Sequence, residues 1–446
     1  MGRALALATV ACLFAYPASA ESLAEALASA YANNPTLNAE RAALRATDEG
    51  VPQALAGYRP TVSATADAGI SSSAGGGAPF YPRGISISVE QPIFNGHRTL
   101  NGVKIAETAV LAGREALRNA EQNTLLSAAQ AFMDLVQAQA LLNLRRENMD
   151  FLNQQVRAAE DRLNVGEGTR TDVAQTRARL AAGQAEYNAA AAQLNTAVAI
   201  YEQVIGHRPR SLGAASPIEG MLSRTLNAAL ADAMTMHPAI LAAGYNIDIA
   251  EFNVKVSEGA LLPTLSVTGS LSHRTDGNGP GTLSNSAQAV ARLSVPIYSG
   301  GQTSSEVRES KEVLGQRRIE LDAARDQVRQ AVISAWGGLD AARAQIRAAE
   351  AQVAAEQLVL SGVIEERNVG QQTTLDVLNS QQELLNARVA LISAQHDRVI
   401  ASYSLLAAMG QLNAERLGLR VERYDPANHY VQVRDSWGGL RTPDGR

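Results

Sequence analysis

The chain has 446 residues, a length that accommodates two or three domains. Charged residues make up only 19% of it, and the formal net charge of −5 excludes the basic surface that nucleic-acid binding requires. Aromatic residues make up 4% and alanine about a sixth, so there is little bulk for an ordinary globular core. Long alanine-rich stretches favour closely packed helices instead.

The first twenty residues have the features of a secretory signal peptide. Arg3 precedes an apolar run over residues 4–16, and Ala18-Ser19-Ala20 forms an A-x-A cleavage site. Cys12 is the only cysteine, which excludes a disulfide framework and a cysteine metal cluster. We expect cleavage after residue 20; acylation of Cys12 in a lipoprotein signal is the alternative. No later run of 18 apolar residues exists, so the sequence predicts a membrane span only as a β-barrel.

The rest of the chain is a tandem duplication. Residues 22–35 (SLAEALASAYANNP) align with residues 225–238 (TLNAALADAMTMHP) at an offset of 203. With one inserted residue the offset becomes 204 and aligns residues 91–96 (QPIFNG) with residues 295–300 (VPIYSG). A period of this length exceeds that of solenoid repeats, so each half is a whole structural unit. The predicted division is a first repeat over 21–212, a linker over 213–224, a second repeat over 225–410 and a tail over 411–446.

Each repeat contains a predicted β-hairpin, over about 61–92 and about 264–296. In these segments apolar residues alternate with small polar ones, as Val62 and Ala64 alternate with Ser63 and Thr65. Such alternation is required of strands with one lipid-facing and one water-lined face. A soluble hairpin with one wet face has the same pattern, and the export signal favours the membrane interpretation.

Long helical hairpins follow, over about 98–206 and about 302–410. Their first arms, 98–164 and 302–368, would each extend roughly 100 Å as continuous helix. A seven-residue apolar repeat in the last arm predicts supercoiling against a partner helix; its members are Leu378, Leu385, Ile392, Val399 and Leu406. Gly337 and Gly338 lie inside the second long arm, where we expect a bend or a close contact.

These parts predict a mainly α protein with a β membrane part. Four strands per chain cannot close a barrel, and open strand edges are not tolerated in lipid. Several chains must therefore share one barrel, with the helical hairpins extending away from the membrane. The number of subunits does not follow from this argument.

The duplication and its motifs resemble the TolC family of outer-membrane efflux proteins. The resemblance covers about residues 22–412, and its motifs are the NP and HP helix starts, the QPIFNG and VPIYSG strand ends, and two N-V-G-x-x-T-x-x-D-V turns. It implies a homotrimer with a twelve-stranded barrel in the outer membrane and a twelve-helix periplasmic barrel. The implied partners are outer-membrane lipid, a periplasmic membrane-fusion adaptor, and an inner-membrane ABC transporter or proton-driven pump. The tail, from Tyr424 to Gly438, is similar to tails of α-proteobacterial type I secretion members.

The resemblance also assigns site residues to the two turns. In the family these turns form the closed, adaptor-facing end, where an aspartate ring narrows the pore. Asp376 occupies the ring position, and the second ring aspartate is replaced by Asn379. The gating tyrosine and arginine positions hold Arg367 and Gln372, and the aspartate that they engage is Asp172. The implied docking turns comprise Asn164, Val165, Gly166 and Thr169 in the first repeat, and Asn368, Val369, Gly370 and Thr373 in the second.

Each of these residues also has a purely structural interpretation. The turn glycines suit left-handed helix ends, and Asp172 and Asp376 suit the first turn of the returning helices. His237 precedes Pro238 as Asn34 precedes Pro35, so helix capping explains that histidine.

The sequence predicts neither an enzyme nor a cofactor. The six histidines lack metal-ligand spacing, and G-x-S-x-G, H-E-x-x-H and P-loop motifs are absent. The predicted function is an exit duct that receives substrate from an adaptor and pump, for type I secretion or efflux. The alternatives are a component of a multidrug efflux pump only, and a non-transport periplasmic or surface coiled-coil protein.

Overall fold

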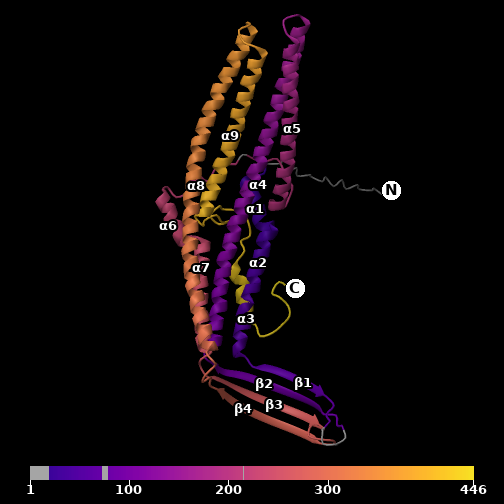
Figure 1. The fold of residues 1–446 in the computed structure, drawn as a ribbon, viewed down its shortest axis with the longest axis vertical. Coiled ribbons are helices and arrows are strands. Elements are labelled where there is room, and N and C mark those ends of the chain that lie inside the picture. Colours follow the sequence, from indigo (N-terminus) through magenta and orange to yellow (C-terminus); the bar gives the residue numbers. More distant parts are fainter. Residues whose placement is uncertain (1–19, 73–78, 214, 446) are drawn as a thin grey trace, which may run out of the picture.

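The computed structural model describes residues 20–72, 79–213 and 215–445, and shows an elongated, mainly helical chain with one small sheet at one end (Figure 1). The predicted signal peptide, apart from Ala20, lies outside the described residues. The first repeat comprises α1 (Leu23–Asn33), α2 (Pro35–Asp48), α3 (Gly50–Leu55), η1 (Ala56–Tyr58), β1 (Thr61–Ala68), β2 (Arg83–Asn95), α4 (Arg98–Asn164) and α5 (Arg170–Ile205). After η2 (Glu219–Met221), the second comprises α6 (Leu226–Met236), α7 (Pro238–Gly259), β3 (Thr264–Thr275), β4 (Leu283–Ser294), α8 (Gln302–Asn368) and α9 (Thr374–Ala408); α10 (Pro426–Val433) lies in the tail.

The short helices of the two repeats begin at the predicted capping residues. The Asn34 side chain accepts hydrogen bonds from the backbone N–H groups of Thr36, at 2.9 Å, and Leu37. In the second repeat His237 Nδ1 accepts one from Ala239 N at 3.2 Å. Each cap is followed by proline, whose missing N–H costs nothing at the first helical position. The capping interpretation of His237 is therefore confirmed.

The predicted strands form one antiparallel sheet in the order β1-β2-β3-β4. The β2–β3 pair joins the hairpin of the first repeat to that of the second. Val62 pairs with Val89, and Leu271 lies between Ile87 and Ala287, so apolar residues of all four strands share one face. The predicted alternation is confirmed as two chemically different faces of a single sheet.

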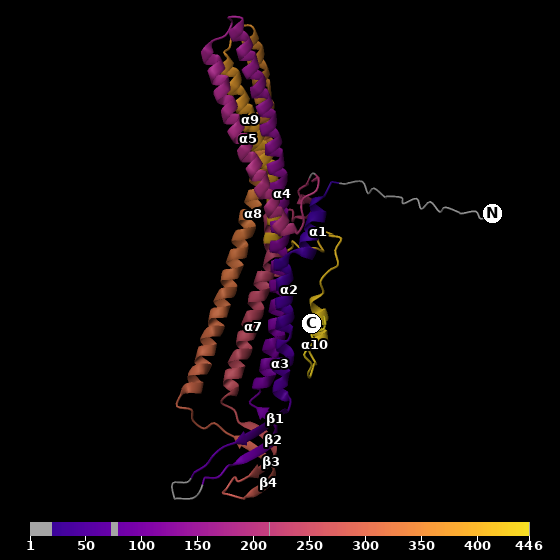
Figure 2. The ribbon, with the colours of Figure 1, turned by 90° about the vertical axis from the view of Figure 1, so that its right-hand side faces the viewer.

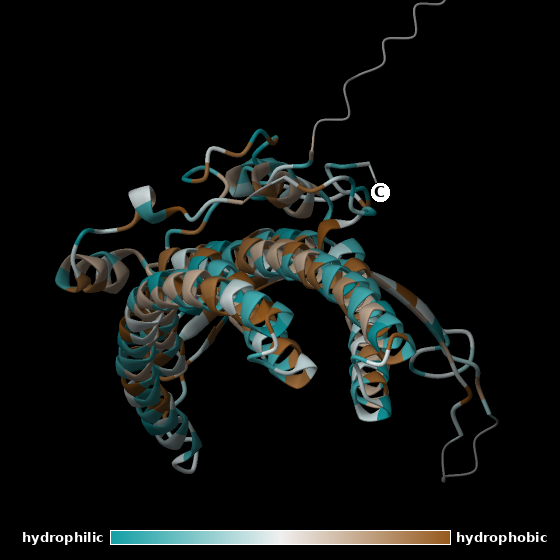
Figure 3. Ribbon diagram, turned by 90° about the horizontal axis from the view of Figure 1, so that it is seen from above, coloured by the Kyte–Doolittle hydropathy of each residue, from teal (hydrophilic) through white to brown (hydrophobic). Residues whose placement is uncertain are grey.

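The helices α4 and α8 extend from the sheet to the far end of the molecule. Their bounds coincide with the predicted 98–164 and 302–368. Each folds back through a tight turn into α5 or α9, so that both helical tips lie far from the sheet (Figures 1 and 2). The seven-residue repeat of α9 faces its neighbours, with Leu378, Leu385, Val399 and Leu406 buried. Seen along the long axis, the helices form an arc with a concave and a convex side (Figure 3).

Two local expectations can be compared with the structure. The helix α8 continues through Gly337 and Gly338, and a Cβ built at either position would meet no atom within 4 Å, so the expected close contact is wrong. Among the described residues, α4 is long and apolar enough to cross a membrane by length and composition. Half of that stretch is buried inside the protein, as in a core helix rich in alanine and leucine.

The helices together form an elongated rod that extends away from the sheet. The main core lies midway along this rod, where α1, α4, α5, α9 and the tail meet. Phe132 of α4 and Tyr201 of α5 are fully buried, with ring centroids 6.4 Å apart. Leu27, Leu406 and Leu412 pack into the same cluster. Burial of these side chains fixes the short helices and the tail against the long hairpins.

A second close contact lies where the helices meet the sheet. Gly96 has a φ of +66°, and a Cβ at this position would lie 2.1 Å from the carbonyl oxygen of Gly259, the last residue of α7. Only glycine allows the end of β2 to approach α7 so closely.

We expect Gly96→Ala to destabilise the protein by more than the roughly 1–2 kcal/mol of a left-handed alanine, because backbone must also move. Gly418→Ala is the matched control, since Gly418 has a similar φ of +63° but no atom within 4 Å of a built Cβ. Thermal unfolding of the purified variants measures both effects. Equal losses of stability would contradict the close-packing argument.

Candidate functional site: the sheet, the helical tips and the seam between repeats

The sheet exposes one apolar face and one polar face. Val62 is 69% exposed and Leu293 64% exposed on the apolar face. On the other face hydroxyl pairs run across the strands, joining Ser63 to Ser88 at 2.8 Å. Ion pairing of Arg274 Nη2 with Asp67 Oδ1, at 2.9 Å, continues this polar row. A sheet with an exposed apolar face this large requires an apolar environment on that side.

The two edge strands of the sheet, β1 and β4, are hydrogen-bonded on one side only within the described residues. Their outer N–H and C=O groups therefore need partners from elsewhere.

At the other end the two helical tips have the same turn. Gly166 and Gly370, with φ of +84° and +81°, close α4 and α8. In each turn the residue after the glycine donates its N–H to the carbonyl five residues back, as Glu167 N does to Arg162 O at 2.8 Å. The left-handed interpretation of both glycines is confirmed. The turns leave Val165 and Val369 equally exposed, at 71% each.

Asp172 and Asp376 have equivalent roles at the start of the returning helices. Each is the third residue of its helix and closes a capping box: Asp376 Oδ2 accepts from Thr373 N at 2.9 Å, and Thr373 Oγ1 accepts from Asp376 N at 3.2 Å. Asp172 and Thr169 repeat this arrangement. The hydrogen bonds from Thr373 hold the pKa of Asp376 below its usual value, so this exposed carboxylate stays charged.

Two of the remaining predicted gate residues, Arg367 and Asn379, have partners inside the chain. Arg367 Nη1 donates to Gln155 Oε1 of α4 at 2.9 Å, and Nη2 donates to Asn368 Oδ1. Asn379 accepts from Arg179 of α5 at 3.0 Å. Arg367 therefore does not contact Asp172 in this chain. Partial burial, with Arg162 nearby, lowers the pKa of the Arg367 guanidinium. Gln372 lies partly exposed beside the turn.

The structure also reveals a polar seam between the repeats, where α4 meets α9. His396 of α9 donates from Nε2 to Asp134 of α4 at 2.8 Å and from Nδ1 to Asp397 at 2.9 Å. Gln137 of α4 donates to Ser393 of α9 at 3.2 Å. Hydrogen bonding to Asp134, above all, raises the pKa of His396. The sequence contains no signal for this pairing, because the two residues are 262 positions apart.

The linker and the tail brace the middle of the rod. Glu219 in η2 accepts from Arg398 of α9 at 2.8 Å and from Arg343 of α8 at 2.9 Å, and these hydrogen bonds hold its pKa below the usual value. In the tail, His429 of α10 bonds to the buried Asp48 of α2 at 2.9 Å. The linker thus ties together the two arms of the second hairpin, and the tail lies along the first repeat.

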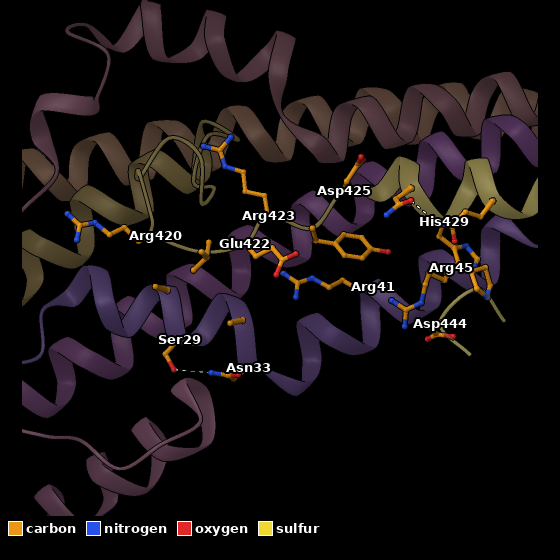
Figure 4. Close-up of a pocket in the computed structure, with 17 residues that line it drawn as sticks. Ser29, Asn33, Arg41, Arg45, Arg420, Glu422, Arg423, Asp425, His429 and Asp444 are labelled. Carbon is orange, nitrogen blue, oxygen red and sulfur yellow. Dashed lines mark hydrogen bonds between the residues drawn. The ribbon is translucent and has the colours of Figure 1, made fainter. Parts of the chain in front are cut away.

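A surface cavity of about 1070 Å³ lies between α1, α2 and the tail. Arg41 lines this cavity. Its guanidinium carbon lies 4.5 Å from the ring centroid of Tyr31 and 5.3 Å from that of Tyr424. Figure 4 shows further charged residues around the cavity: Arg45, Arg420, Glu422, Arg423, Asp425 and Asp444. Charges of both signs line it. Within the described ranges no group of three or more His, Cys, Asp or Glu residues is placed to hold a metal ion.

Comparison with known proteins defines the class to which this architecture belongs. The sequence model of the family described as outer membrane efflux protein matches residues 26–207 and 229–411, one segment in each repeat. The chain belongs to this family. The matched segments start in α1 and α6 and end near Gly206 and Gly410, so they follow the duplication.

Individual relatives support the family assignment. The chain is 48% identical over 436 residues to the outer membrane efflux protein BepC of Brucella suis, covering 96% of this chain and 94% of that protein. It is 25% identical to the outer membrane protein TolC of Escherichia coli, covering 91% and 85%. It is also 25% identical to the alkaline protease secretion protein AprF of Pseudomonas aeruginosa, covering 75% and 71%. Of these relatives, BepC is named for efflux and AprF for protease secretion.

Solved structures share the fold. The Campylobacter jejuni CmeC outer membrane channel superposes with a TM-score of 0.78 at 16% identity, over 93% of this chain and 89% of that chain. A CusC structure gives 0.76 at 18% identity, over 87% and 92%. Together with the family membership, this identifies the chain as an exit channel of the Gram-negative outer membrane that serves efflux or secretion. The alternative of a non-transport coiled-coil protein is thereby excluded.

The seam should make stability depend on pH. Folding raises the pKa of His396. Its contribution to the free energy of unfolding is therefore fully present below about pH 6.5 and is lost as pH rises through the raised pKa. We expect His396→Gln to flatten the fall in thermal stability between about pH 6 and pH 9.

Ser393→Ala is the matched control at the same seam. It removes the hydrogen bond from Gln137, which has no titratable group, and should lower stability equally at both ends of the pH range. An unchanged pH profile in His396→Gln would contradict the assignment.

Proposed function

We propose that three copies of this chain form a continuous duct, with a twelve-stranded barrel in the outer membrane and a twelve-helix barrel in the periplasm. The single observation that carries the proposal is the four-stranded sheet with two open edges and one exposed apolar face. In lipid such edges must pair, and β1 of one copy with β4 of the next leaves none open. The arc of helices, with its concave side inward, supports the same closure (Figure 3).

The proposed organisation of the chain follows the duplication. Residues 1–20 are a cleaved export signal, and residues 21–212 and 225–410 each supply one barrel hairpin and one helical hairpin. The linker 213–224 lies around the middle of the duct, and the tail 411–446 begins there and continues toward the sheet. Glu219 in the linker supports this placement, since it bonds to both α8 and α9.

We further propose that the duct is the outer-membrane part of a tripartite system. A periplasmic membrane-fusion adaptor docks on the turns, and an inner-membrane ABC transporter or proton-driven pump delivers the substrate. Type I secretion and drug efflux both suit a passive duct, and the relatives include AprF, named for protease secretion, and BepC, named for efflux. We propose that the pump, and not the duct, selects the substrate.

The helical tips are the proposed gate. Three copies of Asp376 around one axis would form a ring of like charges that attracts cations and narrows the pore. Asn379 in place of a second acidic ring leaves fewer charges there. Asp172, Arg367 and Gln372 lie at the same end, and Arg367 is proposed to reach Asp172 across copies rather than within one.

The assembly is tested by mass. Detergent-solubilised protein should have the mass of three chains and conduct ions in planar bilayers. A stable, folded monomer would contradict the proposal.

The placement of the sheet in the membrane is tested by a pair of neighbouring substitutions. Val267→Arg places a charge on the apolar face and should cost about 2–4 kcal/mol near the middle of the bilayer. Ser266→Arg changes the polar face and should leave insertion intact. The reverse result would place the strands one residue out of register.

The gate is tested by separating charge from capping. Asp376→Asn keeps an oxygen for the capping box but removes the charge, so it should weaken cation selectivity and block by trivalent cations. Thr373→Ala removes the cap, costing the helix about 1 kcal/mol, and should leave selectivity unchanged because Asp376 remains. Unaltered selectivity in Asp376→Asn would place the constriction elsewhere.

The adaptor contact is tested by cross-linking in cells. Cysteines introduced at the exposed positions Val165 and Val369 should cross-link to the adaptor, because they lie at the two helical tips. Asn278→Cys, in the loop between β3 and β4, is the control and should give no adaptor cross-link. Cross-links from Asn278 alone would mean that the sheet, and not the tips, faces the adaptor.

A further inference from the structure

The end of the tail exposes large apolar side chains that the packing of this chain does not explain. Trp437 is 75% exposed and Leu440 is fully exposed. Both follow α10 and come after Val433, the last buried residue in the described part of the tail. The chain has only two tryptophans, and the other, Trp336, is partly buried against the core of the second repeat.

The exposed Trp437 side chain has a defined orientation, because Arg59 packs against one face of its ring. The Arg59 guanidinium lies 4.5 Å from the centroid of the Trp437 ring, and its Nη1 donates to the carbonyl oxygen of Ser436 at 2.7 Å. These two contacts orient the indole with one face on the arginine and the other open. The contact joins positions 377 residues apart, so it is a feature of the tertiary structure.

The position of Arg59 places this contact at the border between the helices and the sheet. Arg59 follows η1, and β1 begins two residues later, at Thr61. In Figures 1 and 2 the yellow tail descends along α2 and α3 toward this border. It lies on the convex side of the arc, away from the concave side that would line the duct (Figure 3).

Other exposed aromatic residues lie at the same border. Tyr58 is 49% exposed, and its carbonyl oxygen accepts from the Gln91 side chain of β2 at 3.0 Å. Tyr298, four residues after the end of β4, is 86% exposed. Tryptophan and tyrosine concentrate at the two water interfaces of a membrane, because one part of each ring system is apolar and another forms hydrogen bonds.

We propose that Trp437 and Leu440 insert into the periplasmic surface of the outer membrane and anchor the tail to phospholipid. The inference rests on the proposed placement of the sheet in the membrane. Phospholipid is favoured over a second copy of the chain because the tail lies on the convex side, and the helices and strands of neighbouring copies meet at the ends of the arc. Arg59 acts as a positioning residue that keeps the indole at the level where the strands enter the lipid.

The two tryptophans make the test direct, because Trp336→Phe leaves Trp437 as the only one. This variant is reconstituted into vesicles of phospholipids brominated either near the headgroup or near the end of the acyl chain. We expect Trp437 to lose most of its fluorescence with the shallow bromines and much less with the deep ones. Trp437→Phe, which leaves only Trp336, is the matched control and should keep its fluorescence with both. Absence of quenching of Trp437 would overturn the anchor.

A third variant separates failure of the anchor from failure of the membrane sheet. Leu271→Trp, in a chain with both native tryptophans replaced by phenylalanine, reports on the apolar face of β3 and should be quenched by the deep bromines. Quenching at Leu271→Trp without quenching of Trp437 would overturn the anchor and leave the duct intact. Absence of quenching at both would overturn the membrane placement itself.

Replacement of Arg59 provides a readout that a merely structural tail would not give. Arg59→Ala removes both contacts with the Ser436–Trp437 segment. In the Trp336→Phe chain it should make the quenching of Trp437 less selective for the shallow bromines, because the indole is no longer held at one depth. An unchanged depth profile would mean that Arg59 does not position the tryptophan.

Discussion

The backbone of a β-strand in lipid must have all of its N–H and C=O groups paired, and the rest of this architecture depends on that requirement. Within the chain β2 and β3 are paired on both sides, whereas β1 and β4 are paired on one. In the proposed assembly the duplication supplies one section of a barrel, which further copies complete. The helical arms support the same arrangement, because an arc with a concave side resembles a section of a tube (Figure 3).

The two repeats are joined differently along the rod. Near the sheet they meet through the β2–β3 ladder and the close approach of Gly96 to α7, which leave little room for movement. Midway along the helices the repeats meet in the main core, beside which His396 bonds to Asp134. Toward the tips Phe151 of α4 packs against the apolar cluster of Leu360, Val377 and Leu384, and Arg367 bonds to Gln155. In the proposed gate, a docking partner would have to change these contacts.

The middle of the rod is braced from outside. The linker bonds to α8 and α9 through Glu219, and the tail bonds to α2 through His429 and continues toward the sheet. With Trp437 held by Arg59 at the start of β1, the proposed anchor would connect this brace to the membrane surface. One face of the periplasmic rod would then have a defined position relative to the lipid.

Features that depend on local interactions could be predicted from the sequence. The bounds of α4 and α8, the caps at Asn34 and His237, the two glycine turns and the alternation in the strands all depend on residues within a few positions of each other, so their patterns are visible in the chain. The family motifs gave the tips their proposed functional meaning. Contacts between distant residues were decided only by the tertiary structure. Arg367 bonds to Gln155 and not to Asp172, His396 meets Asp134, and Arg59 meets Trp437, because helix packing brings together side chains that are more than 200 positions apart.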